Sequence, residues 1–368
     1  MKKSKKAKKI VITCVSNFVL IMILLAVVLL IPTVHVTVKT YYGALSNKFI
    51  GKKAEYQGVI YLWNVDTFEG GSASKSSFLM KTAVNFEKKY KGALIKVDNL
   101  TTTEMFAKLK NGEKPHIISF GCGVGGFLSE EMLSFDEKLI KNHMENMASA
   151  GFQNQSLKAI AWAMSGYSLI TTTEKLERAS ADFKLTHKEQ ALSLSYDKKV
   201  GKKTKHIYSL TFGGNDYSSA MNLFSRTFSQ SSEGLAESGI LDSAYRKQTS
   251  YQAYCSFIEN KSTYLLATGR DIHRMQNRLT AGKVQDFLYQ PFQEYTDLVQ
   301  FISVINSQPN IEKVCNQFVE YLVSQKVQEN LSSIGMLSPL KNMNLYQNHF
   351  LKDLENSIDE NTLIKSAF

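Results

Sequence analysis

The chain contains only two tryptophans, Trp63 and Trp162, and polar side chains follow each of them closely. Asn64 and Asp66 come directly after the first, and Tyr167 follows the second. An aromatic ring can stack on the apolar face of a sugar, while amides and carboxylates pair with its hydroxyl groups. These residues are therefore candidates for binding a hydroxyl-rich small molecule. The alternative is that the rings fill cores and that the polar residues cap turns.

A third candidate is the pair Arg270-Asp271, which follows an expected strand at 262–268. In one interpretation both side chains lie at a cleft mouth, where the planar guanidinium of Arg270 would suit an acidic ligand. In the other, Asp271 caps a helix that carries Arg274 and Arg278 on a solvated face. The sequence slightly favours the helix start.

Patterns typical of catalysis are missing from the sequence. It has no H-E-x-x-H and no G-x-S-x-G, and its seven histidines show no metal-ligand spacing. The glycine-rich run at 121–126 follows the third expected strand, whereas a dinucleotide loop needs the first strand of its unit. We expect a flexible crossing segment there, and we expect no enzyme activity, no cofactor and no metal.

The net charge of +11 includes six lysines within the first nine residues, so the rest of the chain carries about +5 (11 − 6). That excess is too small to indicate a nucleic-acid partner. One further basic cluster lies at 198–206. We interpret it as a solvated loop, with a surface facing anionic lipid or cell-wall polymer as the alternative.

Residues 10–31 form an apolar run directly behind the lysine head at 1–9. At about 1.5 Å per residue, this run spans roughly 33 Å, close to the hydrocarbon thickness of a bilayer. The positive-inside bias predicts a single-pass anchor with a cytoplasmic N-terminus and an extracytoplasmic domain. A cleaved signal peptide is the alternative, although no clean cleavage site follows. Cys14 lies too early in the run for lipidation, and the other three cysteines are expected to be free thiols.

Beyond a polar stalk at 32–57, strands and helices alternate. The expected elements follow one another with short connections: strand 58–63, helix 75–90, strand 92–97, helix 104–112 and strand 117–120. This order predicts a parallel sheet covered by helices. Ligands of such sheets gather beyond the carboxyl ends of the strands, where Trp63, Asn64 and Asp66 lie.

The later chain continues this pattern. We expect an apolar strand region at 159–172 with a glycine break, a helix at 250–261 and a helix at 311–329. Residues 175–250 are the least clear part, because polar helical stretches alternate there with loops.

Together these stretches resemble the family 1 extracellular solute-binding proteins, the sugar-binding group that includes maltose-binding protein. The resemblance rests on the order of four weak motifs between about residues 58 and 340. They are the first strand with Trp63-Asn64, the strand entry N-G-E-K-P-H-I-I-S-F at 111–120, the segment A-W-A-M-S-G-Y at 161–167, and residues 257–266 with the helix that precedes Ser338-Pro339. Departures include His116, where the family usually has aspartate, and Ala161, where proline often stands.

The resemblance implies an α/β, two-lobed periplasmic-binding-protein-like (type II) fold, here preceded by the N-terminal transmembrane helix. We expect lobe 1 to comprise 58–121 and about 289–330, and lobe 2 about 122–288 and 331–368. The ligand, a carbohydrate or other small polar solute, would bind in the cleft as the lobes close. The implied partners are a membrane permease and its cytoplasmic ATPase.

Two other functions stay open at this point. A membrane-anchored sensor or scaffold could share the fold without a transport role. An extracellular polysaccharide hydrolase is less favoured, because no convincing pair of catalytic carboxylates is evident.

Overall fold

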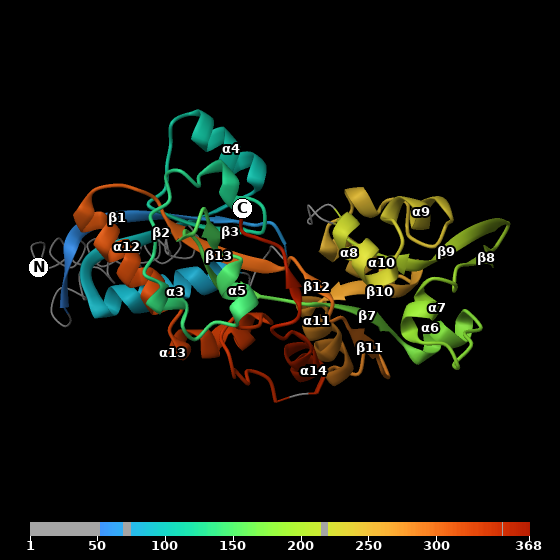
Figure 1. Cartoon of the computed structure of the whole chain (residues 1–368). Helices are drawn as coiled ribbons and strands as arrows, with labels where there is room; N and C mark the ends of the chain where they lie inside the picture. The colour runs from blue at the N-terminus through green and yellow to red at the C-terminus, as the bar shows by residue number, and fades with distance from the viewer. Residues whose placement is uncertain (1–51, 69–74, 215–219, 348) are drawn as a thin grey trace, which may run out of the picture.

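The computed structural model describes residues 52–68, 75–214, 220–347 and 349–368, and the expected apolar anchor at 10–31 lies outside these ranges. Within them, no helix is long and apolar enough to cross a membrane. The described chain forms two lobes side by side, each built around a five-stranded sheet (Figure 1). This is an α/β architecture, as the alternation of strands and helices predicts.

Lobe 1 contains a mixed sheet in the order β2-β1-β3-β13-β6. Strands β1, β2 and β3 run parallel, and β13 runs antiparallel to both β3 and β6. Leu79, Ala83 and Phe86 form the buried stripe of α3 that the helical periodicity predicts. The bounds are β1 Lys52–Val65, α3 Lys75–Lys89, β2 Tyr90–Leu100, α4 Thr102–Lys110, β3 Ile117–Gly121, β6 Ile160–Met164, β13 Val299–Val304 and α12 Pro309–Leu322.

Lobe 2 contains the second sheet, in the order β11-β7-β10-β9-β8. Strands β9 and β10 are parallel, whereas β7 runs antiparallel to β10 and β11. The basic cluster of the sequence forms the β8–β9 hairpin at the far end of this lobe (Figure 1). The bounds are β7 Tyr167–Thr171, β8 Tyr196–Val200, β9 Lys203–Thr211, α8 Ala220–Phe228, α10 Ser250–Ile258, β10 Ser262–Thr268, α11 Gly269–Thr280 and β11 Leu288–Pro291.

The two lobes also contain shorter helices and strands. They are η2 Gly125–Phe127, η3 Glu137–Ile140, α5 Glu145–Ser149, β4 Phe152–Gln153, β5 Ser156–Leu157, α6 Thr173–Arg178, α7 His187–Ala191, α9 Ser232–Glu237, η4 Tyr245–Lys247, β12 Tyr295–Thr296, α13 Gln325–Gln328, η5 Glu329–Ile334, α14 His349–Ser357 and β14 Leu363–Ile364.

The chain passes between the lobes at Ser165-Gly166, which joins β6 to β7, and again at 292–298, which joins β11 to β13. These two crossings are bonded to each other, because Ser165 N donates to Leu298 O at 2.8 Å and Thr296 Oγ1 donates to Ser165 O at 2.8 Å. The chain also reaches lobe 2 between η5 and α14, and α14 packs on α11 and β11 of that lobe. Such paired crossings are typical of a hinge between two lobes.

The division of the chain between the lobes differs from the expected one. Lobe 1 continues past residue 121, because β6 pairs with β13 in the first sheet, and β11 at 288–291 belongs to the second sheet. Residues 52–57, expected in the stalk, are part of β1. The glycine-rich run at 121–126 ends β3 and leads into η2 within lobe 1, and it does not cross to lobe 2.

Candidate ligand-binding site

The carboxyl ends of the parallel strands in each lobe lie at the edge facing the other lobe. Gly121 at the end of β3 pairs with Gln300, and Val299 pairs with Met164, the last residue before the crossing. In lobe 2, Thr268 at the end of β10 pairs with Tyr167, the first residue after that crossing. The loops that follow β1, β3 and β10 are therefore at the junction of the lobes, where sheets of this kind bind ligands.

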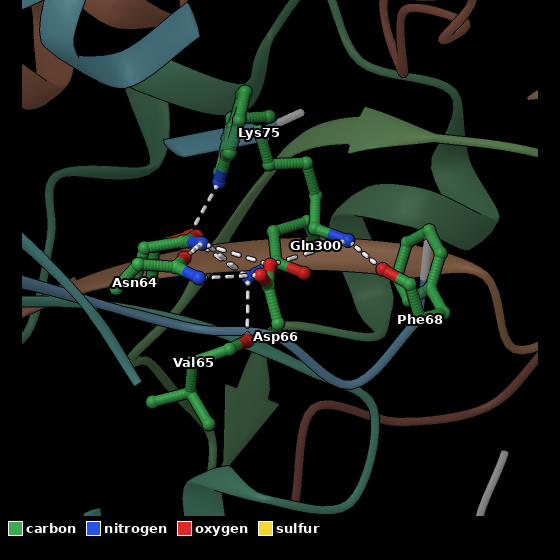
Figure 2. A network of polar contacts seen from close by, with 9 residues as sticks. Asn64, Val65, Asp66, Phe68, Lys75 and Gln300 are labelled. Carbon is green, nitrogen blue, oxygen red and sulfur yellow. Dashed lines mark hydrogen bonds and ion pairs between the residues drawn. The ribbon is translucent and has the colours of Figure 1, made fainter. Parts of the chain in front are cut away.

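A network of polar side chains occupies the end of β1 (Figure 2). The Asn64 amide donates to Asp66 Oδ1 at 3.0 Å and to Asn99 Oδ1 at 2.6 Å. The Asn99 amide in turn donates to Asp66 Oδ2 at 2.7 Å. Asn64 is fully buried, whereas the Asp66 side chain is 14% exposed and Asn99 lies at the surface. The network thus presents a carboxylate and an amide to solvent.

Beneath this surface pair the network continues into the core of lobe 1. Ser119 Oγ donates to Asn64 Oδ1 at 3.1 Å and accepts from Gln300 Nε2 at 2.9 Å. It also accepts from Trp162 Nε1 at 3.1 Å, and the Trp162 ring stacks on Phe78 with centroids 5.7 Å apart. Buried polar groups in such a chain hold one another in place, so the exposed members are preorganised.

A buried cation completes the group. Lys75 begins α3 with a side chain that is only 1% exposed, and its Nζ donates to the carbonyl of Phe68. The same nitrogen lies 3.9 Å from Asp66 Oδ1 and 3.7 Å above the Phe68 ring (Figure 2). A charge removed from water needs such partners, so Lys75 fixes the position of the Asp66 carboxylate.

Two buried acceptors beside the network have no hydrogen-bond partner among the described residues. They are Gln300 Oε1 and Thr67 Oγ1. Thr67 packs so closely on β3 that a Cβ on Gly121 would lie 1.8 Å from its hydroxyl oxygen. Unpaired buried oxygens are costly, and a bound hydroxyl or water would relieve that cost.

The sequence-predicted residues of lobe 1 are brought together only in part. Asn64 and Asp66 share the network, and Trp162 lies below them, fully buried. Trp63 is 3% exposed and lies on the other face of the sheet, with Lys108 Nζ 5.5 Å from its ring. Direct contact of either tryptophan with a ligand stays a prediction, because both rings are covered in this structure.

The sequence-predicted residues of lobe 2 lie at its junction edge. Tyr167 is fully buried, and its hydroxyl donates to Asp297 Oδ1 at 2.7 Å across the two crossings. Asp271 is the N3 residue of α11, and its carboxylate accepts from Thr268 N at 3.2 Å and from Arg274 Nη1 at 2.5 Å. Burial raises the pKa of Asp271, and the Arg274 guanidinium opposes that rise. Arg270 is half-buried in the same turn.

Lobe 2 also carries an aromatic group that the sequence analysis did not single out. Tyr251, 59% exposed, is in the first turn of α10 and stacks on Tyr254 at 6.3 Å between centroids. The Arg274 guanidinium lies 5.3 Å from the first ring and 5.5 Å from the second. This turn of α10 meets the end of β9, where a Cβ on Gly213 would lie 2.4 Å from Ser250 N. An exposed ring near this edge is suited to stacking on a ligand.

Metal-ligating and thiol groups are the remaining candidates for chemistry in the described chain. No group of three or more His, Cys, Asp or Glu residues suited to a metal ion occurs in the part of the chain that the structure describes. Cys122, Cys255 and Cys315 are free thiols, and burial raises the pKa of Cys122 and Cys315 well above that of an ordinary thiol. Such thiols are inert rather than nucleophilic.

Comparison with known proteins shows the fold. No protein-family model matches the chain, and no curated protein matches its sequence. Among solved structures, the GacH receptor of Streptomyces glaucescens GLA.O, solved unliganded and in complex with acarbose, matches at a TM-score of 0.60 and 15% identity, over 85% of this chain and 89% of that chain. Maltose-bound MalE3 of T. maritima matches at a TM-score of 0.61 and 10% identity, over 84% of this chain and 90% of that chain. The sugar-binding protein MalE of Xanthomonas citri matches at a TM-score of 0.58 and 14% identity, over 84% of this chain and 86% of that chain. The chain therefore has the two-lobed fold of these binding proteins.

Proposed function

We propose that this protein is an extracytoplasmic solute-binding protein that captures a carbohydrate between its lobes and delivers it to an ABC importer. The observation that carries the proposal is the Asp66–Asn99 pair, preorganised at the end of β1 on the edge that faces lobe 2. Solved proteins of the same fold that bind maltose, acarbose or chitin oligosaccharides support it by analogy.

In the proposed complex, the Asp66 carboxylate accepts hydrogen bonds from sugar hydroxyls and the Asn99 amide donates to them. The exposed ring of Tyr251 packs on an apolar sugar face from the lobe 2 side, and Arg270 contributes a charged donor. Trp162 acts from below by holding Ser119, which in turn holds Asn64. Closure of the hinge brings the two halves of the site onto the ligand.

The proposed location follows from the predicted anchor. The apolar run at 10–31 would tether the domain to the outer face of the cytoplasmic membrane, within reach of a permease in the same membrane. In sealed vesicles whose interior is the cytoplasmic side, we expect added protease to digest the domain outside. The N-terminal lysine head should be protected inside. Release of a shortened, soluble protein would instead support signal-peptide cleavage.

Calorimetry of the full chain against a panel of malto-, chito- and xylo-oligosaccharides tests the function. We expect micromolar binding to at least one sugar, weakened tenfold or more by Asp66→Ala, because about 1.4 kcal/mol of lost contact corresponds to a factor of ten. Asp98→Ala is the matched control, since Asp98 lies on β2 outside the network and pairs with Lys96. No binding to any sugar would favour the sensor or scaffold function, and release of shortened glycans would indicate a hydrolase.

A further inference from the structure

The last ten residues of the chain form a strap that returns from lobe 2 to lobe 1. We define the strap as residues 359–368, which follow α14 and run between the lobes to the carboxyl end (Figure 1). Its strand β14 pairs in parallel with β12 on the second crossing. The Asn146 amide of lobe 1 donates to Asp359 O and to Thr362 O, both at 2.8 Å.

The end of the strap is fitted into the loop that follows β3. Gly123 N donates to Ser366 O at 3.0 Å, and Gly125 N donates to Ala367 O at 2.9 Å. Cys122 Sγ lies 3.1 Å from Lys365 O. Ala367 is fully buried, and its own N–H donates to Ala150 O at 2.9 Å. The end of the strap is therefore bonded to lobe 1 through backbone groups.

Two glycines of this loop, Gly123 and Gly125, lie directly against the strap. A Cβ on Gly125 would lie 2.9 Å from Ala367 O, and Gly123 has a φ of +74°, in the left-handed region that favours glycine. The glycine-rich run at 121–126 thus forms a seat for the strap, which accounts for a motif that neither a cofactor nor a lobe crossing explains.

The seat adjoins the proposed binding site. Gly121, next to Cys122, is the residue on which Thr67 packs, and it pairs with Gln300 of the polar network. The N–H groups of Gly123 and Gly125 follow at the same edge of the sheet, and both are taken by the strap. Backbone donors at the carboxyl ends of strands are well placed to bind ligand oxygens.

From this geometry we propose that the strap is a built-in competitor that regulates the binding site. Seated, it occupies the donors of the β3 loop and ties lobe 1 to the hinge crossing. Released, it frees those donors and lets the lobes move. The inference rests on the proposed function for its ligand, but the release of the strap is measured without one.

Cys122 is a natural reporter of strap release, because its thiol lies under Lys365, whereas Cys315 is buried in α12 away from the strap. We would compare alkylation rates at the two thiols by peptide mass spectrometry in the full chain. Ala367→Glu, which places a charge in a buried site, should speed labelling of Cys122 tenfold or more and leave Cys315 unchanged. Leu363→Asp is the matched control, since Leu363 is 43% exposed on the same strap, and it should change neither rate.

An unchanged Cys122 rate in Ala367→Glu would overturn the proposal. If Cys315 also became reactive, the variant would be unfolded. Hydrogen exchange of backbone amides in the wild type would then decide whether the strap releases from a folded protein. The Gly123 and Gly125 amides should then exchange faster than those of β13, and equal protection would contradict a releasable strap.

The competition itself is tested with the tightest-binding sugar of the panel. Ala367→Glu should bind it about fivefold more tightly, because a competent state that is only partly populated weakens the apparent affinity in proportion. Equal affinity in the two proteins, with Cys122 exposed, would overturn the regulatory role. If no sugar binds at all, the proposed function fails while the labelling result stands on its own.

Discussion

At the scale of single residues, Ser119 is the centre of the buried network. Its hydroxyl contacts Asn64, Gln300 and Trp162, so Ser119→Ala leaves several buried polar atoms without that partner. We expect a loss of about 1–3 kcal/mol in the free energy of unfolding, measured by urea titration. Ser333→Ala, at an exposed position, should change it by less than about 0.5 kcal/mol. Equal stability of the two variants would show that the network does not hold the site.

Glu87 on α3 gives a prediction on pH. Burial raises its pKa from 4.5 to about 7, although the Ile95 amide donates to its carboxylate at 2.7 Å. The folded protein therefore binds this proton more tightly than the unfolded chain does. Its contribution to stability is present below about pH 4.5 and is lost as the pH rises towards 7.

The test of that linkage compares Glu87→Gln with the wild type in urea at pH 5 and pH 8. The wild type should lose more stability than the variant over this interval. Glu320→Gln, an exposed change on α12, should keep the pH dependence of the wild type. A Glu87→Gln variant with an unchanged pH dependence would contradict the prediction.

Some residues of the polar network could be predicted from the sequence because they directly follow a recognisable strand. Asn64 and Asp66 belong to this class. Gln300 does not, because it joins Asn64 from a strand 236 positions later in the chain. The burial of Trp162 depends on the same long-range pairing, since β6 joins the sheet of lobe 1 beside β13. A lone tryptophan near a strand end does not reveal which side it faces.

At the scale of elements, the β8–β9 hairpin carries an unfavourable pair. Lys198 lies directly opposite Lys205, and like charges in this position destabilise an antiparallel pair. Lys198→Glu should raise the melting temperature by about 1 °C at low salt, with the gain lost at high salt. Lys199→Glu is the control, because Lys199 lies opposite Thr204. A gain that persists in high salt, or that equals the control, would argue against pairwise electrostatics.

The elements that local periodicity predicted lie close to their expected positions. The expected helix at 75–90 is α3 at Lys75–Lys89, and the expected strand at 262–268 is β10. The lobe boundaries could not be predicted in this way, because they depend on which distant strands pair. The strap was also not predicted, since its own residues bond to lobe 1 mainly through their backbone groups, which leave no side-chain pattern in the strap sequence.

At the scale of the whole molecule, the proposed function requires movement between two sheets that share bonded crossings. The polar network belongs to lobe 1, the exposed Tyr251 belongs to lobe 2, and the strap reaches lobe 1 from α14. A ligand that contacts both lobes favours the closed arrangement by its differential affinity for that state.

Small-angle scattering of the full chain, recorded during titration with each sugar of the panel, tests this account most directly. We predict a saturable decrease in the radius of gyration with at least one sugar in the wild type, and a midpoint at tenfold or more higher sugar concentration in Asp66→Ala. A radius of gyration that stays constant for every sugar in the wild type would contradict capture by lobe closure.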